Sequence, residues 1–203
     1  MKAAIKSLPG YQTIRKLWKP KNARQSLLHQ MPKNSIGAEI GVDQGSFSQQ
    51  ILEIVKPKKL HLIDPWEYQE EEVYQVARYG AKGGKNQENM NTRYQNVVNK
   101  FSAEIASGQI VIHRDYSTNI CSHFDDNYFD WIYIDGNHLY EFVKQDLELY
   151  YRTVKKGGFI TGDDYTEGGW WQGGVKKAVD EFISKGVVRV IWLRDGQFLL
   201  KKN

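Results

Sequence analysis

Residues 129–165, FDWIYIDGNHLYEFVKQDLELYYRTVKKGGFITGDDY, decide the fold of this chain. Two short apolar stretches, 131–134 and 158–161, have the composition of buried strands, and the stretch 139–154 between them places its apolar residues on one helical face. The segment therefore predicts a strand, a helix and a strand. A helical crossover of this kind makes the strands parallel, so their carboxyl ends lie at the same edge of the sheet.

Carboxylates follow both strands at that edge. Asp135 comes after the first strand, and Asp163 and Asp164 come after the second. Open α/β sheets bind ligands at this edge, and three acids on strands about 4.8 Å apart either hold a cation or repel one another strongly. Adjacent residues of an extended strand face opposite ways, so both aspartates can serve only if the strand end twists. The alternative is that one of them caps a turn and the acids point apart.

A second strand-helix-strand unit precedes this one. The stretch 35–40 is strand-like, a glycine-bearing turn follows at 41–45, a helix begins at Ser46, and a second strand at 60–63 closes on Asp64. Units of this size carry nucleotide-like cofactors in α/β proteins. The remaining elements are expected as a strand at 110–112, a helix at 173–185, and a hairpin of 187–193 and 198–201 around Asp195-Gly196.

The chain divides into an N-terminal helical segment, 1–34, and one α/β domain, 35–203. Within the domain, 66–101 is polar and aromatic, with Gly80, Gly83 and Gly84 separating two helical pieces. We expect a helical insertion that closes as a lid over the carboxyl edge of the sheet. An exposed helical hairpin without function is the alternative.

Composition excludes several classes of protein. The 203 residues carry a net charge of +4 without a dense basic stripe, which argues against nucleic acid as a partner. A single cysteine, Cys121, leaves no internal disulfide, and the lack of a signal peptide or long apolar run predicts a soluble cytoplasmic protein away from membranes. The N-terminal cations are interpreted as a solvated helical face: Lys2, Lys6, Arg15, Lys16, Lys19, Lys21 and Arg24.

The glycine turn and the acid after the second strand are candidate cofactor ligands. Gly41 and Gly45 would let the backbone approach a ligand, and Asp64 could accept two ribose hydroxyls. Position 43 is Asp, so the nicotinamide fingerprint G-x-G-x-x-G is absent and a dehydrogenase is disfavoured. A plain tight turn, and an aspartate that caps the turn before Pro65, are the alternatives.

These motifs together resemble class I S-adenosylmethionine-dependent methyltransferases. The order is E-x-G-x-x-x-G from Glu39, I-D-P at Asp64, D-x-I-Y-I-D-G-x-H-x-Y from Asp130, and K-x-G-G-x-I-x-G-D-D-Y ending at Tyr165. The resemblance covers about 35–201 and is nearest to metal-dependent O-methyltransferases of antibiotic sugars and cephalosporin hydroxylase-like proteins. It implies a mostly parallel seven-stranded sheet of order 3-2-1-4-5-7-6, with helices on both faces and an antiparallel C-terminal hairpin.

The resemblance also implies roles for individual residues. Glu39 and Gly41 would flank the methionine part of the cofactor, Gly45 would also contact the cofactor, and Asp64 would bind the ribose. Asp115, Tyr116 and Ser117 would lie by the adenine, and Asp135 would border the cofactor. A divalent ion, usually Mg²⁺, would bind Asp135, Asp163 and Asp164, which agrees with the preference of hard cations for oxygen ligands.

His138 is the candidate base. It is expected on the first turn of the helix after Asp135, where an imidazole could take a proton from a cation-bound hydroxyl; a structural hydrogen bond is the alternative. Some relatives carry an acid at position 137, but Asn137 here cannot act as a base and could serve as the helix N-cap. Tyr165, Trp170 and Trp171 would form an apolar wall for the acceptor or pack under the insertion.

The sequence thus predicts a methyltransferase that transfers a methyl group from S-adenosylmethionine to a hydroxyl of a small molecule, such as a sugar diol or catechol. Mg²⁺ or another divalent cation would assist, with Asp135 and His138 as catalytic residues. The alternative is a non-catalytic or tailoring protein that binds an adenosyl cofactor. The sequence leaves a homo-oligomer open.

Overall fold

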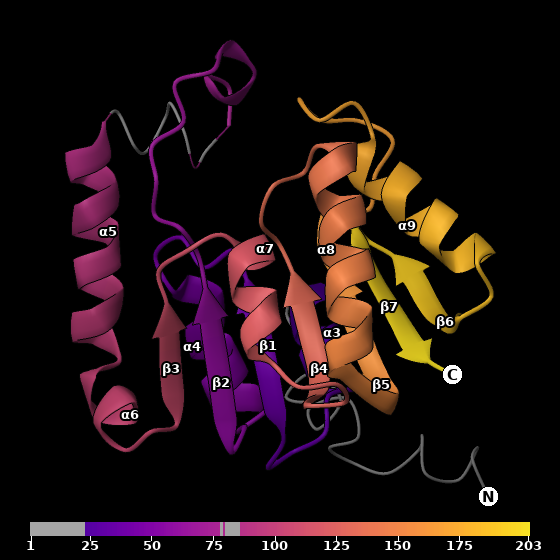
Figure 1. Cartoon of the computed structure of the whole chain (residues 1–203), viewed down its shortest axis with the longest axis horizontal. Helices are drawn as coiled ribbons and strands as arrows, with labels where there is room; N and C mark the ends of the chain where they lie inside the picture. Colours follow the sequence, from indigo (N-terminus) through magenta and orange to yellow (C-terminus); the bar gives the residue numbers. More distant parts are fainter. Residues whose placement is uncertain (1–22, 78, 80–85) are drawn as a thin grey trace, which may run out of the picture.

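The computed structural model describes residues 23–77, 79 and 86–203. Within this part of the chain, seven strands form one mixed sheet of order β3-β2-β1-β4-β5-β7-β6 (Figure 1). The first five strands are parallel, whereas β7 is antiparallel to β5 and β6 is antiparallel to β7. The predicted fold class and strand order are therefore confirmed. The strands are β1 (Ile36–Ile40), β2 (Lys59–Ile63), β3 (Ile110–His113), β4 (Phe129–Ile134), β5 (Val154–Gly162), β6 (Val188–Arg194) and β7 (Gln197–Lys202).

Helices cover both faces of the sheet (Figure 1). The longer ones follow the predicted apolar periodicity, and helix α8 begins at Tyr140, one residue after the predicted start. The described helices are α3 (Ala23–Leu28), α4 (Ser46–Ile54), α5 (Gln87–Lys100), α6 (Ser102–Ala106), α7 (Ser117–Ile120), α8 (Tyr140–Thr153) and α9 (Gly174–Ser184), with short 3-10 turns η1 (Glu72–Tyr74) and η3 (Cys121–His123).

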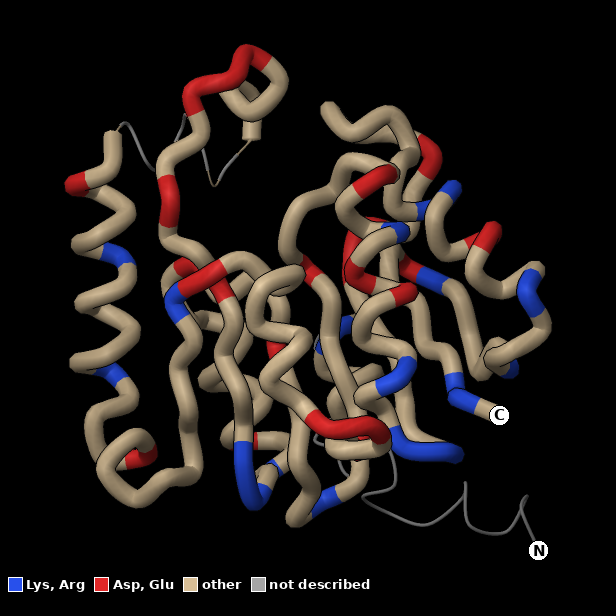
Figure 2. The backbone as a smooth tube through the Cα atoms, viewed as in Figure 1, with Lys and Arg blue, Asp and Glu red and all other residues tan. Residues whose placement is uncertain are grey.

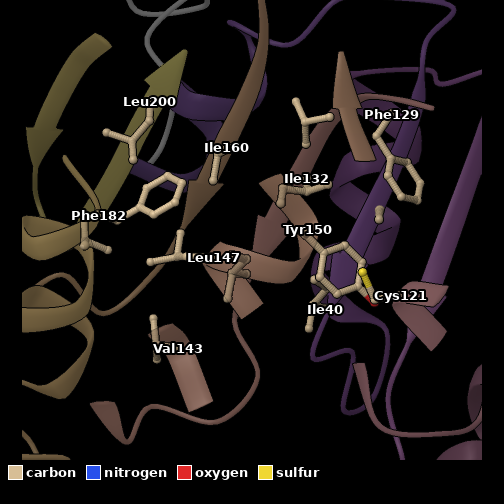
Figure 3. Packing of buried hydrophobic residues seen from close by; sticks show 14 of the residues in the cluster. Ile40, Cys121, Phe129, Ile132, Val143, Leu147, Tyr150, Ile160, Phe182 and Leu200 are labelled. Atoms are coloured by element: carbon tan, nitrogen blue, oxygen red, sulfur yellow. The ribbon is translucent and has the colours of Figure 1, made fainter. Parts of the chain in front are cut away.

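Strand β4 shows how one run of apolar residues serves two cores. Its side chains alternate in direction, so Ile132 and Ile134 pack in one hydrophobic cluster while Trp131 and Tyr133 pack in the other. The first cluster joins the sheet to α8 and α9 through Leu147 and other side chains drawn in Figure 3. Each fully buried aliphatic side chain contributes about 1.5–3 kcal/mol. The double burial explains why residues 131–134 of the strand lack a charged alternate position.

The second cluster includes helix α3, which lies in the predicted N-terminal segment. Leu27 and Leu28 are fully buried in the same cluster as Phe47 and Ile51 of α4. This helix is therefore packed on the domain core. Residues 1–22 of the predicted segment lie outside the described residues.

The insertion 66–101 is anchored at both ends. At its start, Trp66 is fully buried and its indole Nε1 donates to the carbonyl oxygen of Asp43 at 2.8 Å. Near its end, helix α5 buries Met90, Arg93 and Val97. The predicted break at Gly80, Gly83 and Gly84 lies outside the described residues. None of the helices described is long and apolar enough to cross a membrane.

Candidate active site

The candidate site lies at the carboxyl edge of the central strands, where Figure 2 shows acidic residues near the upper strand ends. Asp135 follows β4 and Asp163 follows β5. Backbone hydrogen bonds extend the sheet pairing to both residues, from Asp135 N to Ile40 O at 2.8 Å and from Asp163 N to Ile134 O at 3.2 Å. The sheet therefore fixes the positions of the two acids.

The backbone turns sharply at Asp164, which has a left-handed φ of 56°. A non-glycine residue adopts this conformation uncommonly, and aspartate tolerates it better than most. The turn sends neighbouring side chains to different partners: Asp163 pairs with Arg24 and accepts from Gln197, whereas Asp164 contacts His138. The strand end does bend here, but Asp163 and Asp164 face different partners, as in the alternative that the acids point apart.

His138 joins the acids of the two strands. Its Nε2 lies 3.0 Å from Asp164 Oδ2 and 3.4 Å from Asp135 Oδ1. One ligand atom each from Asp135, His138 and Asp164 lie within 4.8 Å of one another. Among the described residues, this group, and not the predicted trio with Asp163, has the spacing of a cation site. His138 lies in the loop before α8, so the prediction that it sits on the first helical turn was wrong.

Asn137 positions this loop. Its side-chain oxygen accepts from Leu139 N at 2.9 Å, and its Nδ2 donates to the hydroxyl of Tyr74 in the insertion at 2.7 Å. The N-cap residue itself is Leu139, so Asn137 braces the loop without occupying the cap position expected for it. The loop that carries His138 is thus tied to the insertion.

Arg24 of α3 enters the same site. Its Nη2 lies 2.9 Å from Asp135 Oδ2, and it also pairs with Asp163. The interpretation of the N-terminal cations as a solvated face was therefore wrong for Arg24, and the other six lie outside the described residues. No local motif marks this arginine, because its role depends on how α3 docks against α4 and β7.

The charges in the site shift one another's protonation. Burial opposes the charged form of His138, but hydrogen bonds to Asp135 and Asp164 outweigh it and raise the pKa of the imidazole to about 9. For Arg24, burial likewise opposes the charge, and the nearby charge of Asp135 leaves the pKa raised. At neutral pH both groups are therefore cations that face carboxylates.

The glycine turn after β1 lies directly against the end of β4. Gly41 has a φ of 89°, and a Cβ there would come within 2.1 Å of the Asp135 carbonyl oxygen. Glu39 is buried and accepts from the Ser48 hydroxyl at 2.6 Å, and burial raises its pKa to about 8. Gly45, with a φ of 67°, is the N-cap of α4, where a Cβ would lie 2.7 Å from the Phe101 ring. These three predicted cofactor residues lie along one continuous turn.

The side chain of Asp64 is buried, with 2% of its surface exposed, and both of its carboxylate oxygens accept hydrogen bonds from protein donors. One carboxylate oxygen accepts from the backbone N–H groups of Val42 and Asp43 at 2.8 and 3.0 Å. The other accepts from Trp66 N at 2.8 Å and from the Tyr79 hydroxyl. Four donors use the usual acceptor capacity of a carboxylate, so in this arrangement Asp64 braces two turns. Its predicted role as ribose ligand would require at least one donor, such as Tyr79, to leave.

The predicted adenine residues lie after β3 but face different partners. Asp115 accepts from its neighbour Tyr116 N at 2.7 Å and from Asn119 Nδ2 at 2.8 Å. Ser117 donates to Asp146 of α8 at 2.5 Å. Asp146 is 4% exposed, and burial raises its pKa to about 7 despite that hydrogen bond. Sequence reasoning missed Asp146, although an acid on the apolar face of the α8 pattern was a usable signal.

Two of the three predicted aromatic residues flank His138. The ring centroid of Trp171 lies 5.0 Å from that of His138, and Trp170 lies 6.0 Å from His138 and 5.7 Å from Tyr74. The buried indole N–H of Trp171 has no acceptor among the described residues. Tyr165 instead donates to Asp180 of α9 at 2.6 Å, so it does not share this wall.

A comparison with protein families finds a match over more than half of the chain. Residues 38–165 match a family described as a methyltransferase domain. A 44-residue stretch is 48% identical to an uncharacterized protein of Acanthamoeba polyphaga mimivirus and spans 22% of this chain and 20% of that protein.

Solved structures share the fold at low sequence identity. A proposed caffeoyl-CoA O-methyltransferase of Staphylococcus aureus is similar with a TM-score of 0.62 and 16% identity, over 98% of this chain and 92% of that one. An S-adenosylmethionine-dependent methyltransferase of Aquifex aeolicus gives 0.57 and 17% over 94% and 96%. A proposed rRNA methylase of Clostridium thermocellum gives 0.60 and 14% over 91% and 98%. The shared fold thus spans proteins named for different acceptors.

Proposed function

Because this chain belongs to the methyltransferase-domain family and has the class I S-adenosylmethionine-dependent fold, we propose that it methylates a hydroxyl oxygen of a small molecule with the help of a divalent cation. The observation that carries the proposal is the convergence of Asp135, His138 and Asp164 within 4.8 Å at the carboxyl edge of the sheet. A vicinal diol or a catechol suits such a site, because neighbouring oxygens can chelate one cation.

The residues present fit a divalent cation. Asp135 and Asp164 offer the carboxylate oxygens that Mg²⁺ prefers, and Asp163 is adjacent but engaged by Arg24. The two carboxylates would hold the cation and leave the imidazole of His138, which lies beside them, free to take up a proton. A cation held there would lower the pKa of an acceptor hydroxyl and stabilise the oxyanion. The acids of this chain supply the charge that such a cation requires.

The donor side of the site is the turn from Glu39 to Gly45. S-adenosylmethionine, when bound, would supply a methyl group activated by a positively charged sulfur, and the thioether would leave as the methyl carbon bonds to the acceptor oxygen. The absence of a side chain at Gly41 keeps this turn against Asp135, so donor and acceptor sides share a rigid wall. Holding two reactants in line is worth about 7–11 kcal/mol at best, which makes positioning the main task of the protein.

The acceptor side is bounded by aromatic rings. Trp170 and Trp171 flank His138 and can exclude water from the reacting oxygen. The buried indole N–H of Trp171 is a ready donor for an acceptor oxygen. His138 takes the hydroxyl proton in this proposal. Since its raised pKa favours a proton at neutral pH, it acts as a base only once Asp135 or Asp164 is engaged by another partner.

The first experiment separates catalysis from cofactor binding alone. Calorimetry measures S-adenosylmethionine binding, and transfer of a labelled methyl group is then followed with a panel of catechols and sugar diols, with and without EDTA. We expect binding, transfer to a member of the panel, and loss of transfer in EDTA that added Mg²⁺ or Mn²⁺ restores. Binding without transfer to any acceptor would favour the non-catalytic alternative, and transfer that resists EDTA would remove the cation.

Matched variants locate the activity at the candidate site. Asp164→Asn removes one charge beside His138, whereas Asp125→Asn removes one from an exposed position in the loop before β4. We expect transfer to fall only in Asp164→Asn. Equal activity in the two variants would place the chemistry elsewhere.

A further inference from the structure

Arg24 is the charged group of the site that the proposed function leaves without a role. Its guanidinium contacts Asp135 Oδ2 at 2.9 Å and pairs with Asp163, and it lies over the rings of Phe47 and Tyr133 at 5.2 and 6.0 Å. Two of the acids that the sequence assigns to a divalent metal ion are therefore already paired with a positive charge, the guanidinium of Arg24.

The fold holds this arginine at the site. Leu27 and Leu28 lie three and four residues after Arg24, on the same face of α3, and both are fully buried in the core. The helix is thus docked independently of the guanidinium. Because the arginine side chain is long and its exposed fraction is 33%, it can leave the carboxylates by rotation while α3 stays in place.

The contacts of Asp135 make two cations mutually exclusive there. Its Oδ2 is taken by Arg24 and its Oδ1 faces His138. An arginine keeps its positive charge at any pH that a protein survives, so it cannot make room by losing a proton. A second cation at the same carboxylate would meet a fixed positive charge at contact distance, which disfavours both occupying it together.

We propose that Arg24 competes with the divalent cation for Asp135, so that cation binding requires the guanidinium to leave this carboxylate. The inference rests on the cation of the proposed function. It adds that the N-terminal helix sets the affinity for that cation, and it makes Arg24 a positioning residue that acts through the acids.

The direct test is a Mn²⁺ titration of the full chain followed by electron paramagnetic resonance, which needs no acceptor and no turnover. A charge this close moves an acid's proton affinity by about ten- to thousandfold, so we expect Arg24→Gln to bind Mn²⁺ at least about tenfold more tightly than the unaltered chain. Arg24→Lys keeps the charge but loses the planar guanidinium that can donate to two carboxylates, so its Mn²⁺ affinity should lie between those of the unaltered chain and Arg24→Gln. Added Mg²⁺ should displace Mn²⁺ from all three proteins.

The matched control is Arg189→Gln, which makes the same change in net charge at an exposed residue. Arg189 lies near the start of β6, at the opposite end of this strand from the turn at 195–196 that lies beside Asp163. It should bind Mn²⁺ like the unaltered chain. Unchanged or weaker binding in Arg24→Gln, equal tightening in Arg189→Gln, or no Mn²⁺ binding by any variant would overturn the inference.

Thermal unfolding distinguishes competition from a purely structural ion pair. Without divalent ions, Arg24→Gln should melt at a lower temperature because Asp135 and Asp163 then repel each other, and Mg²⁺ should restore the lost stability. A loss that Mg²⁺ does not restore would also count against the inference. Methyl transfer is measured separately, so loss of the proposed activity and loss of the competition give different results.

Discussion

Two groups of carboxylates lie at the same edge of the sheet and are neutralised in opposite ways. At the ends of β1 and β2, Glu39 and Asp64 are buried and are satisfied by hydroxyl and backbone donors. At the ends of β4 and β5, Asp135 and Asp163 contact the cationic Arg24, and Asp164 contacts His138. Neutral donors fixed by the backbone hold one group, and mobile charged side chains hold the other.

The difference suggests two roles: the first group holds the fold together, and the second can exchange its partners for a ligand. A backbone N–H cannot leave Asp64 without moving a turn, whereas Arg24 can rotate away from Asp135 and be replaced by another cation. Buried neutral hydrogen bonds cost about 1–3 kcal/mol per group left unpaired, while partly exposed ion pairs contribute much less. The first group should therefore govern folding, and the second should govern ligand binding.

Asp64→Ala, in the first group, should cause the largest loss of stability. The substitution leaves three backbone N–H groups without an acceptor, so we expect the free energy of unfolding to fall by about 4 kcal/mol or more. Urea unfolding followed by circular dichroism measures it. Asp163→Ala is the matched change in the other group and should cost less than half as much, because Arg24 keeps Asp135. Equal losses would erase the distinction.

The dependence of stability on pH sharpens the comparison through Asp146, another buried acid bonded to a neutral hydroxyl. Its pKa rises on folding from 3.8 to about 7, so the folded state binds the proton more tightly and stability falls as pH rises between these values. Ionisation should cost on the order of 4 kcal/mol. Asp146→Asn should remove that part of the fall, leaving the part due to Glu39, whose pKa is about 8. Parallel unfolding curves against pH for the two proteins would contradict this.

His138→Ala should lower turnover and leave the binding of S-adenosylmethionine unchanged. Loss of a group that takes up a proton lowers kcat by about 100-fold or more. The rate of labelled methyl transfer measures this, with unchanged calorimetric binding of S-adenosylmethionine as the companion observation. His123→Ala, at an exposed residue of η3, should keep full activity. An undiminished rate in His138→Ala would strip the residue of its proposed role.

Trp170→Ala should have the smallest effect and should touch only the acceptor. Loss of an aromatic contact is worth about 0.5–1.5 kcal/mol, so the KM for the acceptor should rise roughly threefold to tenfold with little change in kcat. Trp170→Phe keeps an aromatic ring and should preserve most of the affinity. If the KM for S-adenosylmethionine rises instead, the tryptophan belongs to the donor side of the site.

The architecture and the edge that carries the site could be predicted because both follow from local patterns. Apolar runs, the helical crossover after Ile134 and the Asp195-Gly196 turn each specify their own segment, and parallel crossovers bring Asp135 and Asp163 to one edge. The order of the strands came from the resemblance to S-adenosylmethionine-dependent methyltransferases, and the structure confirms it.

The partners of the site residues could not be predicted, because they depend on long-range docking. Arg24 meets Asp135 across more than a hundred residues of sequence, through burial of Leu27 and Leu28. The occupied state of Asp64 depends on Tyr79 of the insertion, which carries no recognisable motif. His138 lies in the loop and not on the helix, because the side chain of Asn137 forms hydrogen bonds with Leu139 and with Tyr74 of the insertion. Residue types were visible in the sequence, but their contacts were not.

The contact of Gly41 with the Asp135 carbonyl has a practical consequence for redesign. There is no room for a methyl group at Gly41, so the loop after β1 and the loop after β4 are packed directly against each other. A change in either loop would therefore shift the other. New acceptor preferences should therefore be sought in the peripheral segments, such as the one carrying Trp170 and Trp171 or the one carrying Tyr74. Libraries confined to those segments would vary the acceptor side of the proposed site while leaving the packing of Gly41 against Asp135 unchanged.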